Sequence, residues 1–405
     1  MKQPSLLGGA MIVAGTTIGA GMLANPTATS GVWFVGAVLA LIYTWGCMTA
    51  SGLMLLEVNM YYPEGASFYT MVRDLLGRGW NRINGLAMAF TLYILTYAYI
   101  TSGGGITERL LSGSTLQVSH SGGELLFCGV LTFAVWLSTK AVDRFSTVLI
   151  GGMVIAFFFS TAGMLSGVKA EILFNTLGEG DSHYLRYLWV ALPVCLVSFG
   201  FHCNVPSLTK YYHKDAKKVS RAILIGTGLA LLMYLLWQTA VQGNLPRGAF
   251  AEVTAKGGDV ATLLEALGHY IRVDYVAPAL DFFAYMAIAS SFLGVTLGLF
   301  DYIADLFKFN GSLWGRTKTA LVTFLPPLAM SLLYPYGFVK AIGYAGLAVA
   351  IWTVIVPALL VRAFRKRHPE GAGYRVWGGE VVIWLVLAFG LLNILAMLKT
   401  LIFNG

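Results

Sequence analysis

The feature that most constrains this chain lies at its start, where residues 3–56 include no Asp, Glu, Lys or Arg. A helix that crosses the hydrocarbon core of a bilayer needs roughly 20 apolar residues. The stretch therefore has room for two membrane-spanning helices, and Asn25-Pro26 with Gly31 marks the turn between them. Glycines interrupt the first helix and many apolar stretches follow it, so we expect it to be retained rather than cleaved as a signal peptide.

The amino-acid composition also indicates a membrane protein. Hydrophobic residues make up 57 % of the 405 residues and charged residues only 11 %, whereas soluble domains typically contain about 45–50 % and about 25 %. The aromatic content of 13 % excludes a disordered chain. The four cysteines have neither the spacing of a disulfide framework nor that of a metal site, so we expect no bound metal and no cofactor.

Further charge-free stretches follow along the whole chain and bring the number of expected helices to eleven. The sequence therefore predicts an all-α integral membrane protein with eleven transmembrane helices in one domain, residues 1–405. The further stretches are residues 83–107, 125–139, 145–168, 187–209, 222–246, 282–300, 319–339, 341–361 and 381–398.

The Lys and Arg residues indicate the orientation in the membrane. A cytoplasmic N-terminus places most of the 27 Lys and Arg residues, including the basic run at 362–367, on the cytoplasmic side. Cytoplasmic loops carry this excess in membrane proteins, so we expect a cytoplasmic N-terminus and a periplasmic C-terminus. Topology then explains the net charge of +8 without a nucleic-acid partner. The partners we expect are the lipid bilayer and a small-molecule substrate, and no obligate protein partner is evident.

Two of the expected helices contain residues that interrupt a helix. The first carries Gly15, Gly19 and Gly21 before Pro26, and the sixth carries residues 198–206. Unwound backbone is tolerated in a membrane only where it lines a cavity, and matched interruptions in two halves are typical of a transporter's binding site.

The two interruptions begin two runs of five helices each. The runs cover residues 6–167 and 185–362, and residues 379–403 form an appended eleventh helix. Because each run has an odd number of helices, the second run must be inverted relative to the first.

Several segments resemble the bacterial aromatic amino acid permeases, which belong to the amino acid, polyamine and organocation superfamily. The resemblance covers nearly the whole chain, and within the family it is strongest to the tryptophan-specific members. It implies an inverted five-plus-five helix fold of the leucine-transporter (LeuT-like) type and secondary active import across the bacterial inner membrane. The segments are residues 15–22, 93–100, 136–142, 198–202, 204–207, 210–212, 290–302, 304–307, 343–346 and 376–379.

An amino-acid substrate brings a carboxylate and an ammonium, and both must exchange water for hydrogen bonds. Free N–H groups around Gly19 would meet the carboxylate at the positive end of a half-helix, and carbonyls around Thr17 and Ser198 would accept from the ammonium. Tyr97 and Phe201 are the best candidates to enclose an aromatic side chain. The expected substrate-binding residues are Thr16, Thr17, Ile18, Gly19, Ala20, Gly21, Tyr97, Ser198, Phe199, Gly200 and Phe201.

Three residues are candidates for coupling or gating. His202 lies within the second interruption, where we expect water and a polar partner. Asp281 lies near the outer end of the eighth helix. Met153 stands where the resemblance leads us to expect a lysine, whose ammonium would occupy the place that sodium takes in sodium-coupled relatives. His120, in an outer loop, and Glu124, at a helix end, receive no role.

Without that lysine, an oxygen-rich cavity would fill with water or take a cation. The sequence thus leaves open proton coupling through another group such as His202 or Asp281, sodium coupling at the vacated site, or an engineered or natural variant that binds substrate but couples poorly. Met153 as an ordinary core residue is a further alternative. The possible cation site comprises Ala14, Thr17, Ala287, Ser290 and Ser291.

We expect a proton-coupled importer of aromatic amino acids, most of all L-tryptophan, that works by alternating access. Sodium coupling is the alternative. A channel would need a continuous polar lining and a membrane enzyme would need a compact catalytic cluster, and the sequence indicates neither.

Overall fold

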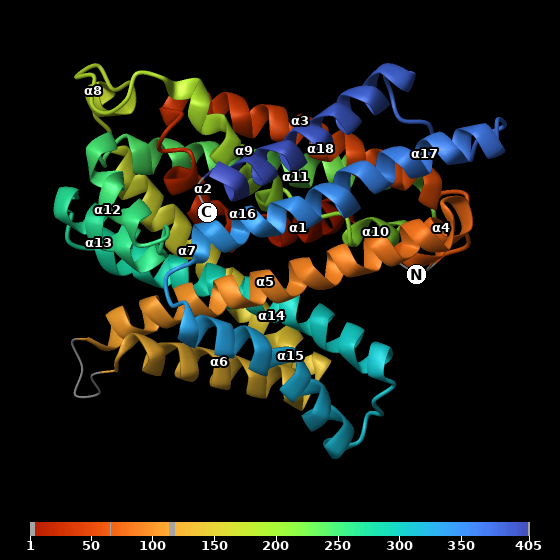
Figure 1. Cartoon of the computed structure of the whole chain (residues 1–405), viewed down its shortest axis with the longest axis horizontal. Helices are drawn as coiled ribbons and strands as arrows, with labels where there is room; N and C mark the ends of the chain where they lie inside the picture. The colour runs from red at the N-terminus through yellow and green to blue at the C-terminus, as the bar shows by residue number, and fades with distance from the viewer. Residues whose placement is uncertain (1–4, 65, 113–117, 272, 404–405) are drawn as a thin grey trace.

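A computed structural model describes residues 5–403 except 65, 113–117 and 272, and every regular element in that part of the chain is a helix (Figure 1). The first half contains α1 (Leu6–Thr17), α2 (Ala20–Ala28), α3 (Trp33–Asn59), α4 (Phe68–Leu75), α5 (Gly77–Leu111), α6 (His120–Leu137), α7 (Thr139–Leu165) and α8 (Ala170–Leu173).

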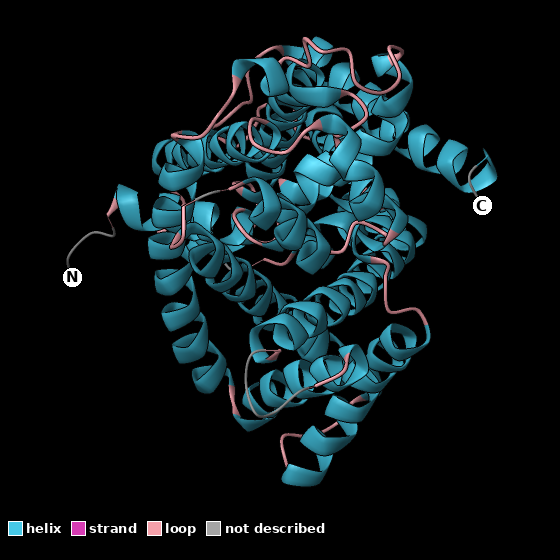
Figure 2. Ribbon diagram, turned by 90° about the vertical axis from the view of Figure 1, so that its left-hand side faces the viewer, coloured by secondary structure: helices cyan, strands magenta, loops and turns pink. Residues whose placement is uncertain are grey.

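The second half is also helical, and Figure 2 shows helices joined by loops throughout the molecule. It contains η1 (Tyr184–Tyr187), α9 (Leu188–Ser198), α10 (Asn204–Tyr211), α11 (Ala216–Gln242), η2 (Arg247–Ala249), α12 (Phe250–Ala255), α13 (Val260–Tyr270), α14 (Val276–Phe307), α15 (Leu313–Leu333), α16 (Phe338–Val349), the π-helical turn η3 (Ala350–Ile355), α17 (Val356–Arg367) and α18 (Gly379–Phe403).

Eight helices of the described residues are long and apolar enough to cross a membrane, or nine if α1 and α2 together form one bent span. Tyr184–Ser198 is a shorter apolar helix, and α15 does not meet the same criterion. A helix lies over each of the charge-free stretches. The all-helical membrane fold is therefore confirmed, whereas eleven spans and an inverted repeat stay predictions.

The expected interruption of the first helix is present. α1 ends at Thr17, α2 begins at Ala20, and the two helices are bent by 51°. Ile18 and Gly19 between them have extended backbone. The sixth helix is interrupted as expected too, because α9 ends at Ser198 and α10 begins only at Asn204.

Long helices surround both interruptions. α14 packs along α7, α1 packs against α11, and α5 contacts α6, α14 and α16. Small residues allow the closest of these approaches: a Cβ atom on Gly104 of α5 would lie 2.8 Å from the backbone nitrogen of Glu124 on α6. Tyr234 of α11 and Ser291 of α14 both reach the interruptions, which places the interruptions between these two helices.

Candidate functional site

The break between α1 and α2 is held by α14. The backbone N–H of Ala20 donates a hydrogen bond to Ser291 Oγ over 3.0 Å. A side chain at Gly19 would collide with that same hydroxyl. Because Gly19 has ordinary extended backbone, the lack of space beside Ser291 is what requires a glycine here.

The two breaks are in direct contact. The hydroxyl oxygen of Ser198, the last residue of α9, lies 3.0 Å from the carbonyl oxygen of Gly21 and 3.0 Å from Asn25 Oδ1, and it can donate its one proton to either. A Cβ atom on Gly21 would lie only 3.1 Å from Ser198 Cα. Glycine at this position therefore lets the backbones of α2 and α9 meet.

A tyrosine from α11 joins the ends of the interrupted helices. The Tyr234 hydroxyl lies 2.6 Å from the carbonyl oxygen of Thr17 and 2.5 Å from that of Ser198. A hydroxyl carries one proton, so it can donate fully to only one of these carbonyls at a time. Two carbonyls that converge on one donor are well placed to receive an ammonium, which has three N–H groups.

Burial differs between the two sides of the helix breaks. Thr16 and Cys203 are exposed, and Asn204 Nδ2 donates to Thr16 Oγ1 over 2.6 Å. Residues 22–28 of α2 and the following Thr29 are buried. The exposed residues of the breaks thus belong to the end of α1 and the start of α10, and those of α2 are covered.

The sequence profile of the tryptophan/tyrosine permease family matches residues 2–397, which is nearly the whole chain. The chain belongs to this family. The resemblance seen in the sequence is thereby confirmed. Members of the family are permeases, so the protein is a transporter and not an enzyme.

Individual relatives differ in the substrate that their names give. The chain is 66 % identical to the tryptophan-specific transport protein of Haemophilus influenzae. The alignment of 403 residues covers 98 % of this chain and 96 % of the relative. It is 43 % identical over 394 residues to the tyrosine permease of Enterobacter agglomerans, covering 96 % and 94 %. It is 42 % identical over 398 residues to the low affinity tryptophan permease of Escherichia coli, covering 97 % and 95 %.

The aromatic candidates of this permease pack against other helices. The Phe199 ring lies 4.9 Å from the Tyr234 ring, and the Phe201 ring lies over Gly52 of α3. The Tyr97 hydroxyl donates to the carbonyl of Tyr334 over 2.8 Å. All three aromatic candidates are buried, so a substrate would have to displace them or bind beside them.

The coupling candidates have very different surroundings. His202 is 1 % exposed, and neither ring nitrogen has a hydrogen-bond partner within the described residues, so the polar partner expected for it is not present there. Asp281 accepts a hydrogen bond of 2.8 Å from Arg109 Nε, which makes it half of an ion pair instead of a free carboxylate in water. Met153 is buried in α7, the helix that packs along α14.

The oxygen atoms proposed as cation ligands take part in hydrogen bonds. The carbonyl of Ala14 accepts from the Ile18 N–H over 2.7 Å, and the Ala287 carbonyl accepts from the Ser290 hydroxyl over 3.1 Å. Ser291 accepts from Ala20, and the Thr17 carbonyl accepts from Tyr234. A cation at this place would have to use the second lone pair of these oxygens or replace the donors.

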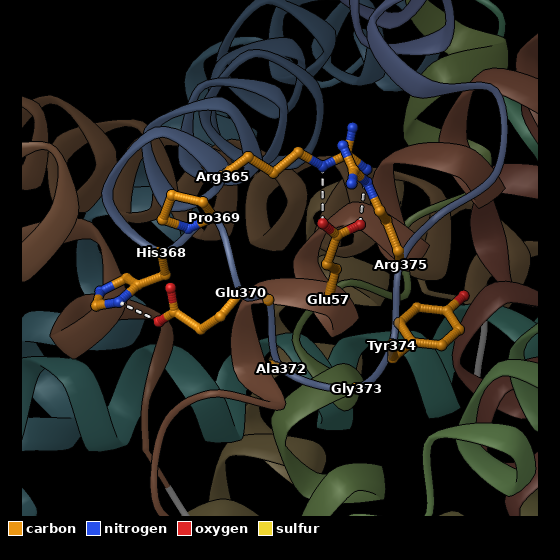
Figure 3. Close-up of a pocket in the computed structure, with 10 residues that line it drawn as sticks. Glu57, Arg365, His368, Pro369, Glu370, Ala372, Gly373, Tyr374 and Arg375 are labelled. Atoms are coloured by element: carbon orange, nitrogen blue, oxygen red, sulfur yellow. Dashed lines mark hydrogen bonds and ion pairs between the residues drawn. The ribbon is translucent and has the colours of Figure 1, made fainter.

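Sequence reasoning missed a buried ion pair between distant helices. Arg365 donates from Nε and Nη2 to the two carboxylate oxygens of Glu57, each over 2.8 Å (Figure 3). The Val376 N–H donates to the same carboxylate over 2.7 Å. The pair borders a cavity of about 200 Å³ beneath residues 368–375. Burial raises the pKa of Tyr374 in this cavity wall to about 12.

Tyr234 was missed as well. It lies in a charge-free stretch that reads as ordinary span, and only the three-dimensional contact with the breaks reveals its role.

Proposed function

We propose that this permease imports L-tryptophan, and other aromatic amino acids less well, across the bacterial inner membrane by cation symport with alternating access. The observation that carries the proposal is the convergence of the Thr17 and Ser198 carbonyls beside the Ala20–Ser291 contact. The two carbonyls can accept hydrogen bonds from an ammonium, and the backbone N–H of Ala20 lies close to Thr17 in the sequence. The arrangement contains no ionised side chain. The printed name of the relative at 66 % identity supports tryptophan as the substrate.

In this proposal the chain crosses the membrane eleven times with a cytoplasmic N-terminus and a periplasmic C-terminus. The two five-helix runs, residues 6–167 and 185–362, form an inverted repeat, with α18 appended. The matched interruptions at α1–α2 and α9–α10 support this arrangement. In alternating access, the site at the helix breaks opens first to one side of the membrane and then to the other.

Competition experiments test the substrate. Uptake of labelled tryptophan into proteoliposomes is measured in the presence of an excess of each of the twenty amino acids. We expect tryptophan to compete best, followed by tyrosine and phenylalanine. Strongest competition by leucine, serine or lysine would show that the helix breaks form some other kind of site.

A gradient experiment separates a transporter from a channel. A symporter accumulates tryptophan above the external concentration when an ion gradient drives it, and uptake saturates. A channel only equilibrates the amino acid, so absence of accumulation under every imposed gradient would exclude symport.

A further inference from the structure

A cluster of ionisable side chains lies apart from the helix breaks, where α5 ends and α6 begins. The cluster contains His120 and Glu124 from α6, Glu108 from α5 and Asp259 just before α13. The distribution of Lys and Arg assigns this end of the molecule to the periplasm. His120 is the first residue of α6 with a side chain only 13 % exposed, so the expectation that it lies in a loop is corrected.

Both ring nitrogens of His120 face hydrogen-bond acceptors. Nδ1 lies 3.1 Å from Glu108 Oε2, and Nε2 lies 3.3 Å from the carbonyl oxygen of Pro335. Nε2 is also 3.6 Å from Glu124 Oε1. A neutral imidazole has one donor and one acceptor nitrogen, whereas the imidazolium has two donors. Only the charged ring can therefore donate at both positions.

The Glu124 side chain is stable as a carboxylate only with a positive charge beside it. Its side chain is 0 % exposed, and neither carboxylate oxygen has a hydrogen-bond partner within the described residues. The close contact between Gly104 and the Glu124 backbone fixes α6 against α5, so the carboxylate cannot easily move out to water. A buried carboxylate is costly unless a cation compensates it. His120 is the nearby group that can supply this charge.

The other charged groups around the ring are acidic or already paired. Asp259 is buried; Oδ2 accepts from Thr262, and Oδ1 has no partner within the described residues. Burial raises the pKa of Asp259. Arg109, next to Glu108 in the sequence, forms its ion pair with Asp281.

Aromatic and backbone groups complete the surroundings of the imidazole. The Tyr336 ring lies 4.9 Å from the His120 ring, and Tyr97 donates to Tyr334 in the same segment between α15 and α16. The Val339 N–H donates to the carbonyl of Gly257 over 3.1 Å, which joins α16 to the segment before α13. His120 therefore contacts the same group of elements that closes this end of the molecule.

We propose that His120 is a proton-binding residue, and that its imidazolium holds α5, α6 and the segment before α16 together when the periplasmic end is closed. When the ring loses a proton, one nitrogen becomes an acceptor that faces other acceptors, and Glu124 loses its counter-charge. Alkaline conditions outside the cell thus favour opening. This proton site is separate from the substrate site, so it stands or fails independently of the proposed substrate.

Nitrogen-15 NMR of histidine-labelled full-length protein in detergent tests the protonation state. We expect an imidazole signal with both ring protons at neutral pH, where an ordinary histidine with a pKa of about 6.5 is mostly neutral. The signal should be lost in His120→Gln and kept in the control His183→Gln, whose exposed ring lies 2.9 Å from Asp181. In Glu124→Gln the ring should lose its proton at lower pH. A neutral His120 ring at pH 7 in the wild type would overturn the proposal.

Hydrogen exchange tests the link to closure. After correction for the intrinsic pH dependence, amide exchange at residues 334–342 should be roughly tenfold or more faster in His120→Gln than in the wild type at neutral pH, because charge-assisted hydrogen bonds are lost. The wild type should approach the variant as the pH rises, and His183→Gln should behave like the wild type. Equal exchange in the wild type and His120→Gln at neutral pH would contradict the role in closure even if the NMR result holds.

Discussion

At the scale of single residues, the space beside Gly19 gives the sharpest test of the helix breaks. Replacing Gly19 by Val puts methyl groups against Ser291, so we expect uptake to be abolished in a protein that still folds in detergent. Gly15→Ala is the control, because a Cβ there meets no atom within 4 Å. Uptake and tryptophan binding are measured for both variants. Near-normal affinity in Gly19→Val would show that this glycine does not border the ligand.

Gly200 provides a second test, at a position where an added side chain meets fewer neighbouring atoms than at Gly19. A Cβ atom there has only the Val197 carbonyl near it, at 3.3 Å. This carbonyl must shift by a few tenths of an ångström to accept a Cβ atom, a much smaller change than at Gly19, so we expect Gly200→Val to fold but to lose uptake because the added methyl groups occupy the substrate's place. Uptake at the wild-type level would place the substrate elsewhere.

Tyr234 is expected to stabilise the protein most when no substrate is bound. Tyr234→Phe leaves the Thr17 and Ser198 carbonyls without their donor, and an unpaired buried polar group costs about 1–3 kcal/mol. If the substrate ammonium uses the same carbonyls, tryptophan should raise the melting temperature of Tyr234→Phe more than that of the wild type. Equal shifts in the two proteins would mean that the ammonium binds at another place.

At the scale of helices, the interruptions could be predicted from sequence but the contacts that hold them could not. The glycines at 15, 19 and 21 and the run at 198–206 are local signals, and the structure has its breaks at Ile18–Gly19 and between Ser198 and Asn204, whereas Pro26 lies inside α2. The partners of the breaks, Tyr234 and Ser291, come from α11 and α14. The sequence indicates Ser291 only as a possible cation ligand, and nothing in the local sequence of α11 distinguishes Tyr234 from other residues of that span.

The buried ion pair between α3 and α17 allows a test of how strongly a contact between distant helices stabilises the fold. Glu57→Gln leaves the Arg365 guanidinium buried without its counter-charge, so we expect a loss of about 3–5 kcal/mol in unfolding free energy. The control is Glu380→Gln, whose carboxylate is 57 % exposed and 3.9 Å from Arg362; it should cost about 0–1 kcal/mol. Denaturant unfolding in detergent measures both. Similar losses in the two variants would mean that the buried pair contributes no more than a surface pair.

The start of α13 should make the stability depend on pH. Asp259 caps this helix, and burial raises its pKa above the value of about 3.9 in an unfolded chain. The folded state thus holds the proton more tightly, and this contribution to stability is lost as the pH rises through the raised pKa. Asp259→Asn keeps the cap and should flatten the pH dependence of the melting temperature above pH 4 or so. Asp215→Asn replaces the N-cap carboxylate of α11 in the same way and is the matched control for the loss of a capping charge.

At the scale of the whole molecule, hydropathy predicted the class of protein because each span carries its own signal. Long-range polar contacts carry no such local signal: the His120 ring meets the Pro335 carbonyl, and Glu57 meets Arg365, only after the helices pack. Glu57 and Glu124 lie at the ends of expected helices, where the sequence indicates no role for them, and both are buried. The family resemblance supplied the expected substrate, since the physical chemistry of the helix breaks alone favours an amino acid without choosing its side chain.

The coupling ion is a property of the whole transport cycle, and Met153 is the residue that bears on it most directly. A thioether has no charge and no N–H group, so it cannot replace the lysine expected at this place. If protons drive uptake through another group, tryptophan affinity at fixed pH should not change with sodium, whereas it should change with pH. If sodium is coupled, sodium must raise tryptophan affinity, because linkage is reciprocal.

Placing a lysine at position 153 distinguishes proton coupling from sodium coupling further. In a proton-coupled protein we expect Met153→Lys to increase uptake driven by an imposed proton gradient, and in a sodium-coupled protein we expect it to abolish the sodium effect by placing an ammonium at the cation site. Met153→Leu is the control, because it conserves the volume and polarity of the buried side chain. If the Lys and Leu variants transport and bind alike under both gradients, Met153 is an ordinary core residue of α7 and the coupling site lies elsewhere, with His202 the first residue to replace.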